Sequence, residues 1–381
     1  MFANRISYLR SIANVMSKPE VPPDLIFFVT SRCNACCEYC HFKKQILDSE
    51  RKKHELSIEE IIKIAYNYGQ LSKLSLCGGE PYIRKDLPEI VQAFVDHCAV
   101  RIVDIPTNGS LTKSIVEQTG KILERNPDLV LEIQMSIDGP EEVHDKLRGF
   151  PSLYKKALQT LKELEKLRKR HKNLRIKMNC IYQEGNQDTI FKMAKEFEQE
   201  YPFDRFQIIY PHGIEELKAR IQKLSYEKFY IISREIQLHM HIRNRLDLHS
   251  LLFRAIKILR DKVLLNVLER YDMGNICHAG SHVGIIDDVG EVYPCEPLWE
   301  SVGNLRKADY SMQKILNGEL MKQFRCKHLG SGKCHCTWLY VALDNIIFTP
   351  RYYPMIMYYM LYLFFLGGWG LQSTEANHVK D

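Results

Sequence analysis

The sequence predicts an α/β protein in which six strand-and-helix units form a partial (β/α)6 barrel of the TIM type, followed by a small cysteine-rich domain. Apolar, strand-like runs alternate with amphipathic, helix-like segments from residue 25 to residue 214, which is the pattern of a parallel sheet with crossover helices. After residue 273 this alternation gives way to a hairpin-like segment and further cysteines. With 381 residues, 45% of them apolar and 26% charged, the chain has the size and composition of a globular protein with a large core.

Residues 1–24 are expected to form an amphipathic extension. Apolar residues recur there at helical spacing, with Arg5 and Arg10 between them, as far as Pro19. Such a helix can pack on the body of the protein or touch a membrane surface. The segment has no uninterrupted hydrophobic stretch and no small-residue cleavage site, so it does not resemble a secretory signal, and we expect a cytoplasmic protein.

The barrel segment, residues 25–214, supplies the strands and the helices between them. In a parallel barrel the loops that follow the strands gather at one end of the sheet, where ligands bind. Here those loops carry the unusual residues, whereas the loops before the strands are plain polar connections. The expected strands are residues 25–30, 73–79, 100–109, 130–139, 174–182 and 205–213, and the expected helices are residues 57–70, 88–98, 114–126, 153–170 and 189–201.

Three segments follow the barrel. Residues 215–272 are amphipathic without strand signals, and we expect a helical connector. Residues 273–345 form the cysteine-rich domain, with a hairpin turn predicted at residues 288–290. Residues 346–381 are mostly apolar and approach the length of a membrane span, but Pro354 and a Gly-Gly pair weaken that assignment. A buried helix, a dimer surface and an interfacial membrane helix all fit this last segment.

Four cysteines, Cys33, Cys36, Cys37 and Cys40, lie in one loop directly after the first expected strand. Neighbouring cysteines do not easily pair with each other and no export signal is present, so metal binding is favoured over disulfides. Three thiolates around an iron–sulfur cube leave one iron without a protein ligand, which is useful only if that iron binds something else. The Cys-x3-Cys-x2-Cys spacing of Cys33, Cys37 and Cys40 resembles the signature of radical S-adenosylmethionine (SAM) enzymes, with Cys36 as a non-ligand. A zinc site is the alternative.

The resemblance to radical SAM enzymes covers about residues 25–210 and implies a set of SAM contacts. An aromatic residue before the last cysteine, Tyr39, would lie beside the adenine. The segment at residues 77–81 resembles the motif that receives the SAM amino group, the segment at 136–139 resembles the one that faces the ribose, and Arg148 matches a basic position near the SAM carboxylate. The implied cofactor-binding residues are Tyr39, Gly78, Gly79, Glu80, Pro81, Asn108, Ser136, Asp138 and Arg148, of which Asn108 rests only on its place in a turn at the same end of the barrel.

The residue types suit those roles. Gly78 and Gly79 allow the backbone to approach a ligand closely, and Glu80 can neutralise an ammonium group. The carboxylate of Asp138 can accept two hydrogen bonds from a diol. The resemblance implies that the cluster passes one electron to the SAM sulfonium, and that the resulting 5'-deoxyadenosyl radical removes hydrogen from a substrate. It also implies a reductant such as flavodoxin or ferredoxin.

A second group of cysteines comprises Cys277, Cys295, Cys326, Cys334 and Cys336. The spacing of Cys277, Gly290 and Cys295 resembles the opening of SPASM and Twitch domains, which hold auxiliary 4Fe–4S clusters in many radical SAM enzymes. Five thiols suffice for one cluster, so a shortened, Twitch-like domain is the closer match. The sequence leaves open which four thiols bind, and whether His328 or His335 replaces one of them. A zinc ribbon is the alternative.

The sequence therefore predicts a radical SAM oxidoreductase with two clusters. The auxiliary cluster either takes an electron from a substrate radical or ligates the substrate, and the first role is preferred because four protein ligands leave no open iron. The predicted substrate is a small molecule or a lipid-linked glycan; the alternatives are a peptide or protein maturase and a non-catalytic zinc or iron–sulfur scaffold. The net charge of +6 is too mild to call for a nucleic-acid partner.

Overall fold

The computed structural model describes residues 20–201, 203–212, 223–239, 248–270, 277–329 and 337–368. The helix expected before Pro19, together with Cys334, His335 and Cys336, lies outside these residues.

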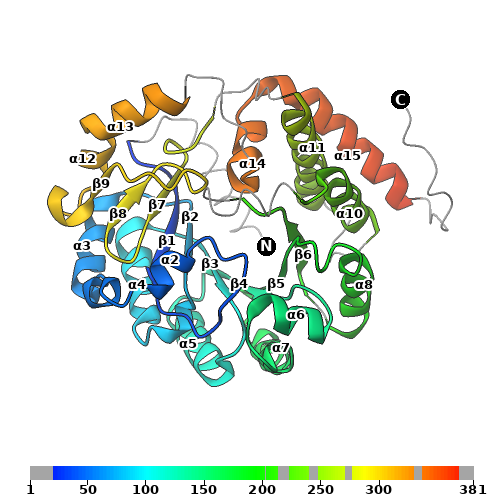
Figure 1. The fold of residues 1–381 in the computed structure, drawn as a ribbon, viewed down its shortest axis with the longest axis horizontal. Coiled ribbons are helices and arrows are strands. Elements are labelled where there is room, and N and C mark those ends of the chain that lie inside the picture. Colours follow the sequence, from blue (N-terminus) through cyan, green and yellow to red (C-terminus); the bar gives the residue numbers. More distant parts are fainter. Residues whose placement is uncertain are drawn as a thin grey trace.

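The described strands belong to one nine-stranded sheet with the order β6-β5-β4-β3-β2-β1-β7-β8-β9 (Figure 1). The first six strands all pair in parallel with their neighbours. Because β6 is an edge strand, the sheet curls without closing, which confirms the partial barrel. These strands are β1 (Asp24–Thr30), β2 (Lys73–Gly78), β3 (Ile102–Thr107), β4 (Val130–Ser136), β5 (Leu174–Ile181) and β6 (Arg205–Ile209).

Helices connect these strands and cover the outside of the sheet, as Figure 1 shows. Helix α3 begins at Ser57, whose hydroxyl accepts from the Glu60 amide while the Glu60 carboxylate accepts from the Ser57 amide, so both exposed amides are paired. The helix ends at Gly69, which has φ +94°. The elements are α2 (Lys43–Leu47), η1 (Arg51–His54), α3 (Ile58–Tyr68), η2 (Pro81–Ile83), α4 (Leu87–Cys98), α5 (Thr112–Arg125), α6 (Glu141–Arg148), α7 (Leu153–Arg170) and α8 (Ile190–Glu200).

The two faces of the parallel sheet have opposite character. Along β4, Leu131, Ile133 and Met135 are fully buried against the helices, whereas the alternating polar residues are only partly buried. Successive residues of a strand point to opposite faces, so the inner face of the barrel is polar, not filled with branched apolar side chains as in a closed barrel. The strand register places these polar residues on that face: Ser75, Asp104, Glu132, Gln134, Ser136, Lys177, Asn179, Arg205 and Gln207.

The cysteine-rich segment continues the barrel sheet. Strand β7 (Val283–Ile286) pairs in parallel with β1, and it forms the predicted hairpin with β8 (Glu291–Tyr293). Gly290, in the turn, has φ +87°. The remaining elements of this segment are β9 (Gly303–Asn304), η3 (Leu305–Ala308), α12 (Met312–Leu316), α13 (Glu319–Phe324) and the π-helical turn η4 (Arg325–Leu329).

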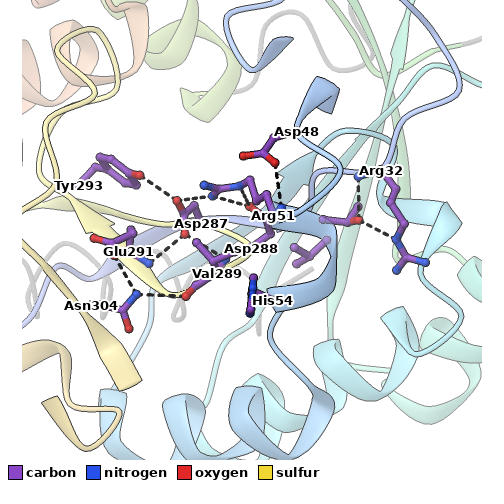
Figure 2. Close-up of polar contacts among 12 residues, drawn as sticks. Arg32, Asp48, Arg51, His54, Asp287, Asp288, Val289, Glu291, Tyr293 and Asn304 are labelled. Atoms are coloured by element: carbon purple, nitrogen blue, oxygen red, sulfur yellow. Dashed lines mark hydrogen bonds and ion pairs between the residues drawn. The ribbon is translucent and has the colours of Figure 1, made fainter. Parts of the chain in front are cut away.

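A buried ion pair fastens this hairpin to the segment that follows the first cysteine loop (Figure 2). The Arg51 guanidinium lies 2.5 Å from the Asp287 carboxylate and 2.6 Å from that of Asp288. Both carboxylates are fully buried. Asp287 also accepts from the Tyr293 hydroxyl at 2.8 Å and from the Glu291 amide at 2.9 Å, so it stabilises the turn at the same time.

Four further helices gather on the side of the sheet next to β6 (Figure 1). They share a second apolar cluster, separate from the main core. Among the described residues, no helix combines the length and the apolar character that crossing a bilayer requires. These helices are α10 (Tyr226–His239), α11 (Leu248–Arg270), α14 (Leu339–Ile347) and α15 (Tyr353–Gly368), with the turn η5 (Pro350–Tyr352) before α15.

Candidate active site

The loop that follows β1 packs directly against the end of β2. The Gly79 amide donates to the Thr30 carbonyl and the Glu80 amide to the Arg32 carbonyl, both at 2.8 Å. A Cβ atom on Gly78 would lie 2.3 Å from the Thr30 oxygen, and one on Gly79 would lie 2.2 Å from the Arg32 oxygen. In the structure both glycines allow two backbone segments to approach each other, and their close approach to a ligand stays a prediction.

The cysteine loop holds three partly buried thiols and one exposed thiol. Cys33, Cys37 and Cys40 are partly buried, whereas Cys36 is exposed and its amide donates to the Arg148 carbonyl at 3.0 Å. Burial raises the pKa of the Cys33 thiol to about 11 and that of the Cys40 thiol to about 12, and it also raises the pKa of Cys37. Metal ligation requires thiolates, so these thiols need a bound positive centre to ionise at neutral pH.

The three partly buried thiols lie near one another. Cys37 raises the pKa of both Cys33 and Cys40, so the three groups are neighbours. No three His, Cys, Asp or Glu side chains in the described part of the chain lie close enough to hold one metal ion. Cys33, Cys37 and Cys40 remain the proposed ligands of the first cluster.

Glu80 is a buried acid at the end of β2. Its carboxylate accepts from the Thr107 hydroxyl and the Asn108 amide at 2.8 Å, and from the Tyr82 amide at 3.3 Å. Burial raises the pKa of Glu80 to about 7, although these hydrogen bonds and the charge of Arg148 oppose the rise. All three donors are uncharged. A buried carboxylate of this kind is stabilised by an approaching cation, so Glu80 stays the proposed partner of an ammonium group.

Asn108 connects the turn after β3 to the cysteine loop. Its side-chain amide donates to the Asn34 oxygen at 2.9 Å, and the Asn34 amide donates to the Ser110 hydroxyl at 2.8 Å. Asn108 is itself buried. Its position next to both Glu80 and the cysteine loop supports the prediction that it belongs to the site.

Three of the predicted SAM contacts are joined by one buried carboxylate. Asp138 accepts from the Tyr39 hydroxyl, from Arg148 Nε at 2.7 Å and from the Ile181 amide at 2.9 Å. Burial would raise the pKa of Asp138, but Arg148, His144 and these hydrogen bonds hold that pKa below its usual value. The group therefore binds the cysteine loop, α6 and β5 together.

These contacts change the roles expected of the residues. The sequence predicts that Asp138 accepts from a ribose diol, whereas both of its oxygens bond within the protein and the side chain is fully buried. Ser136, at the end of β4, is partly exposed on the inner face and is better placed for a ribose contact. Pro81 is buried at the first position of η2, where its fixed φ favours the turn, so it acts in folding.

The structure brings two of the second-cluster cysteines into contacting segments. Cys295 is buried just after β8, and Cys277 lies before the turn that leads into β7. A Cβ atom on Gly280 in that turn would lie 2.8 Å from the Cβ atom of Pro294, so the turn packs against the residue preceding Cys295. Cys326 is exposed in η4. The ligand set of the auxiliary cluster stays a prediction, because Cys334 and Cys336 lie outside the described residues.

His328, a candidate replacement ligand, has other partners in the structure. Its Nε2 atom lies 3.0 Å from the Glu300 carboxylate, and its ring packs against Phe324 with centroids 4.8 Å apart. A histidine in this setting can still bind metal through its other nitrogen, with Glu300 orienting the ring.

Sequence reasoning missed a group that joins the two cysteine-bearing loops. Glu296 is buried, and its carboxylate lies 3.0 Å from His41 Nε2 and 3.4 Å from His212 Nε2. Burial would raise the pKa of Glu296, but the two imidazoles hold it well below its usual value. His41 directly follows Cys40 and Glu296 directly follows Cys295. Adjacency to candidate cluster ligands was the available signal.

An open parallel barrel with neighbouring thiols and a buried glutamate at the carboxyl ends of its strands has the architecture of an iron–sulfur enzyme. Comparison with protein families agrees with this class. The radical SAM superfamily matches residues 27–197, and the SPASM iron–sulfur cluster-binding domain matches residues 277–337. The chain belongs to the radical SAM superfamily and carries a C-terminal SPASM domain. These domains imply 4Fe–4S clusters and SAM as the cofactors.

Several curated proteins are similar to the chain. It is 26% identical to an AdoMet-dependent heme synthase of Methanosarcina barkeri over 84% of this chain and 89% of that protein. It is 34% identical to an Fe-coproporphyrin III synthase of the same organism over 36% of this chain and 33% of that protein. A probable GTP 3',8-cyclase of Pyrococcus abyssi is 32% identical over 44% of this chain and 50% of that protein. The chain thus spans most of the heme synthase, but half or less of the other two.

Solved structures share the fold at low sequence identity. Streptococcus suis SuiB bound to its precursor peptide SuiA has a TM-score of 0.57 at 15% identity, covering 83% of this chain and 70% of SuiB. The enzyme anSMEcpe with bound AdoMet has a TM-score of 0.55 at 18% identity, covering 91% of this chain and 99% of that one. These likenesses confirm the fold of the chain.

Proposed function

We propose that the protein is a radical SAM oxidoreductase that oxidises a carbon centre of a small, polar molecule. The observation that carries the proposal is the convergence of the cysteine loop, Glu80 and Arg148 at the carboxyl ends of the strands, above a polar inner face. When bound, the first cluster and SAM would supply a 5'-deoxyadenosyl radical able to take hydrogen from the substrate, and an auxiliary cluster would supply an acceptor for the electron that leaves, with a proton, to complete the oxidation.

The residues of the chain have distinct parts in this proposal. Cys33, Cys37 and Cys40 hold the first cluster. Glu80 receives the SAM ammonium group, because the three described donors that bond to its carboxylate are all uncharged. Asp138 holds Tyr39 and Arg148 in position without contacting the ligand. Arg148 remains charged because Asp138 and its other acidic neighbours raise its pKa. Electrons enter from a reductant such as flavodoxin or ferredoxin.

A net oxidation needs an exit for the second electron, and the contact between the two loops supports one. His41 and Glu296, which lie 3.0 Å apart, follow Cys40 and Cys295 directly in the chain. The segments that bear the two proposed ligand sets are therefore in contact. Such a contact supports the proposal that the auxiliary cluster would lie close enough to the first site to accept an electron.

The small-molecule substrate is preferred to a peptide because a relative that matches over most of both chains is a heme synthase. The peptide alternative is suggested by SuiB, whose 15% identity supports no more than the fold. Deuterated cell extract, with and without protease treatment, separates the two. Deuterium transfer into 5'-deoxyadenosine that survives protease treatment is expected for a small molecule, whereas its loss would favour a peptide.

The radical chemistry is tested with protein reconstituted under anaerobic conditions. Iron and sulfide are expected to bind, and SAM with dithionite is expected to release 5'-deoxyadenosine. Cys37→Ala is expected to abolish that release, whereas Cys36→Ala, which changes the exposed neighbouring thiol, serves as the matched control. Zinc in place of iron, or equal product from Cys37→Ala and the wild type, would contradict the proposal.

We also propose that α15 contacts an anionic membrane surface. Tyr358, Arg234 and Lys262 line one hollow beside this helix, which places positive charge next to the apolar side chains. Aromatic and basic residues around an apolar face are typical of interfacial binding. The exposed apolar residues of the helix are Tyr353, Met355, Met357, Tyr358, Leu361, Phe364 and Phe365.

A further inference from the structure

A group of cations faces the interior of the barrel at its open side. Lys177 comes from β5, Arg205 from β6, and Lys257 from α11. The Arg205 guanidinium lies 4.0 Å from the centroid of the Phe253 ring, and Lys257 Nζ lies 5.2 Å from the same ring. Both cations therefore rest on one aromatic surface, which stabilises positive charge there.

Lys257 is the cation of this group whose positive charge is least balanced by nearby negative charge. It is 2% exposed, and its ammonium donates to the Gln207 side-chain oxygen at 3.4 Å. The nearby carboxylates have other cations: Glu132 pairs with Lys177, and Asp261 lies 2.6 Å from Arg260. Burial holds the pKa of Lys257 well below its usual value, and Arg205, Arg260 and Lys177 lower it further, while Asp261 opposes them.

The position of Lys257 relates it to the reaction site. Its partner Gln207 is in register with Asn179 on β5, and Asn179 is in register with Ser136 on β4. These residues form one row across the inner face. Ser136 is the residue proposed above to contact the ribose of SAM. The cationic group therefore lies on the same inner face of the sheet as the proposed SAM site.

We propose that Lys257, with Lys177 and Arg205, binds an anionic group of the substrate, either a carboxylate or a phosphate. This inference rests on the proposed function, because it names the class of substrate that the same active site would bind. A buried ammonium that has no carboxylate partner of its own within the described part of the chain is costly. A methionine of similar length would fill the same space without that cost, so the presence of a lysine at this position points to a ligand that supplies the negative partner.

The test measures anion binding by the holoprotein with SAM, independently of turnover. Pyrophosphate and citrate are titrated by calorimetry at constant ionic strength against a chloride background, and the two probes distinguish phosphate from carboxylate. Lys257→Met is expected to lower the affinity for the preferred anion by about tenfold or more, which is the effect of losing a charged hydrogen bond. Lys192→Met, on the exposed face of α8, is the matched control and is expected to bind the anion as the wild type does.

A second measurement avoids dependence on the variant. In a crystal structure of the holoprotein with the preferred anion, the anion is expected within hydrogen-bond distance of Lys257 Nζ. An anion bound elsewhere only, no binding above the chloride background, or equal affinity in Lys257→Met and the wild type would each overturn the inference. If wild-type protein binds the anion but releases no 5'-deoxyadenosine, the proposed function fails instead, so the two failures are distinguishable.

The charge state of Lys257 gives the inference a pH signature. Anion binding raises the pKa of Lys257 towards its usual value, so the complex takes up a proton wherever the free lysine is partly neutral. Anion affinity is therefore expected to fall as the pH rises. An affinity that increases with pH would contradict the assignment, because Lys177, Arg205, Arg260 and Asp261 surround the same ammonium and keep its pKa low.

Discussion

Replacing Arg51 tests the connection between the two iron–sulfur segments. The Arg51→Ala variant removes the guanidinium that lies 2.5 Å from Asp287 and 2.6 Å from Asp288, and both carboxylates are fully buried. Removing one partner of a buried ion pair typically costs about 3–5 kcal/mol of folding free energy, because an uncompensated charge remains. We expect the free energy of unfolding to fall by about that amount.

The loss should depend on pH. Burial already raises the pKa of Asp287 and Arg51 opposes that rise, so without Arg51 this pKa moves higher. A carboxyl group whose folded pKa lies above its unfolded value contributes stability at low pH, and that stability is lost as the pH rises through the folded pKa. Arg51→Ala is therefore expected to be more damaging at pH 8 than at pH 5.

Anaerobic urea unfolding followed by tryptophan fluorescence measures the effect. Arg51→Ala combined with Asp287→Asn should recover part of the stability, because one buried charge is removed with its partner. Lys314→Ala, which breaks the exposed ion pair with Asp309, is the control, and its free energy of unfolding should equal that of the wild type. A loss below about 1 kcal/mol in Arg51→Ala would refute the reasoning, since it would place the pair among weak surface contacts.

Three further outcomes are expected. SAM binding, measured by equilibrium dialysis, should strengthen as the pH rises through about 7, because Glu80 has a pKa of about 7 and must be ionised to attract an ammonium group. The Glu80→Gln variant should lose this pH dependence. A SAM affinity of the wild type that does not change with pH would exclude Glu80 as the partner of the ammonium group. Gly79→Ala should reduce iron incorporation, since the added Cβ atom would lie 2.2 Å from the Arg32 oxygen and displace the cysteine loop; iron content equal to that of the wild type would show that the loop can move. Replacing Tyr358 and Phe365, which are 62% and 61% exposed, by glutamate should abolish flotation with vesicles rich in phosphatidylserine; vesicle binding unchanged by the double variant would remove α15 from the interface.

The repeating elements of the barrel could be predicted from the sequence because their local pattern agrees with their final environment. Strand β4 alternates strictly between apolar and polar residues, and helix α7 was expected at the same bounds, Leu153–Arg170, that the structure gives. Helix α6 was missed because its short sequence is mostly polar, and its burial depends on Asp138 pairing with Arg148 at its end.

The site was only partly predictable for a related reason. Residues with a distinctive local spacing, such as the cysteines after β1, can be recognised from the sequence. His41, His212 and Glu296 come from distant segments and gain their relation from folding alone. The same holds for Lys257, which looks like an ordinary helix lysine until Arg205 and Lys177 are placed beside it. The burial of Asp138, which redirects its hydrogen bonds inward, is likewise a property of the assembled loops.

The pairing of β7 with β1 limits how the protein can be divided. Strand β1 lies between β2 and β7, and residues 24–27 are in register with residues 283–286. A truncated chain ending before residue 277 would leave the strand that leads into the cysteine loop as a bare sheet edge, open to self-association. The SPASM domain therefore cannot be removed without exposing β1. Exchanging it between relatives, or expressing residues 1–276 alone, should yield aggregates and not a minimal enzyme.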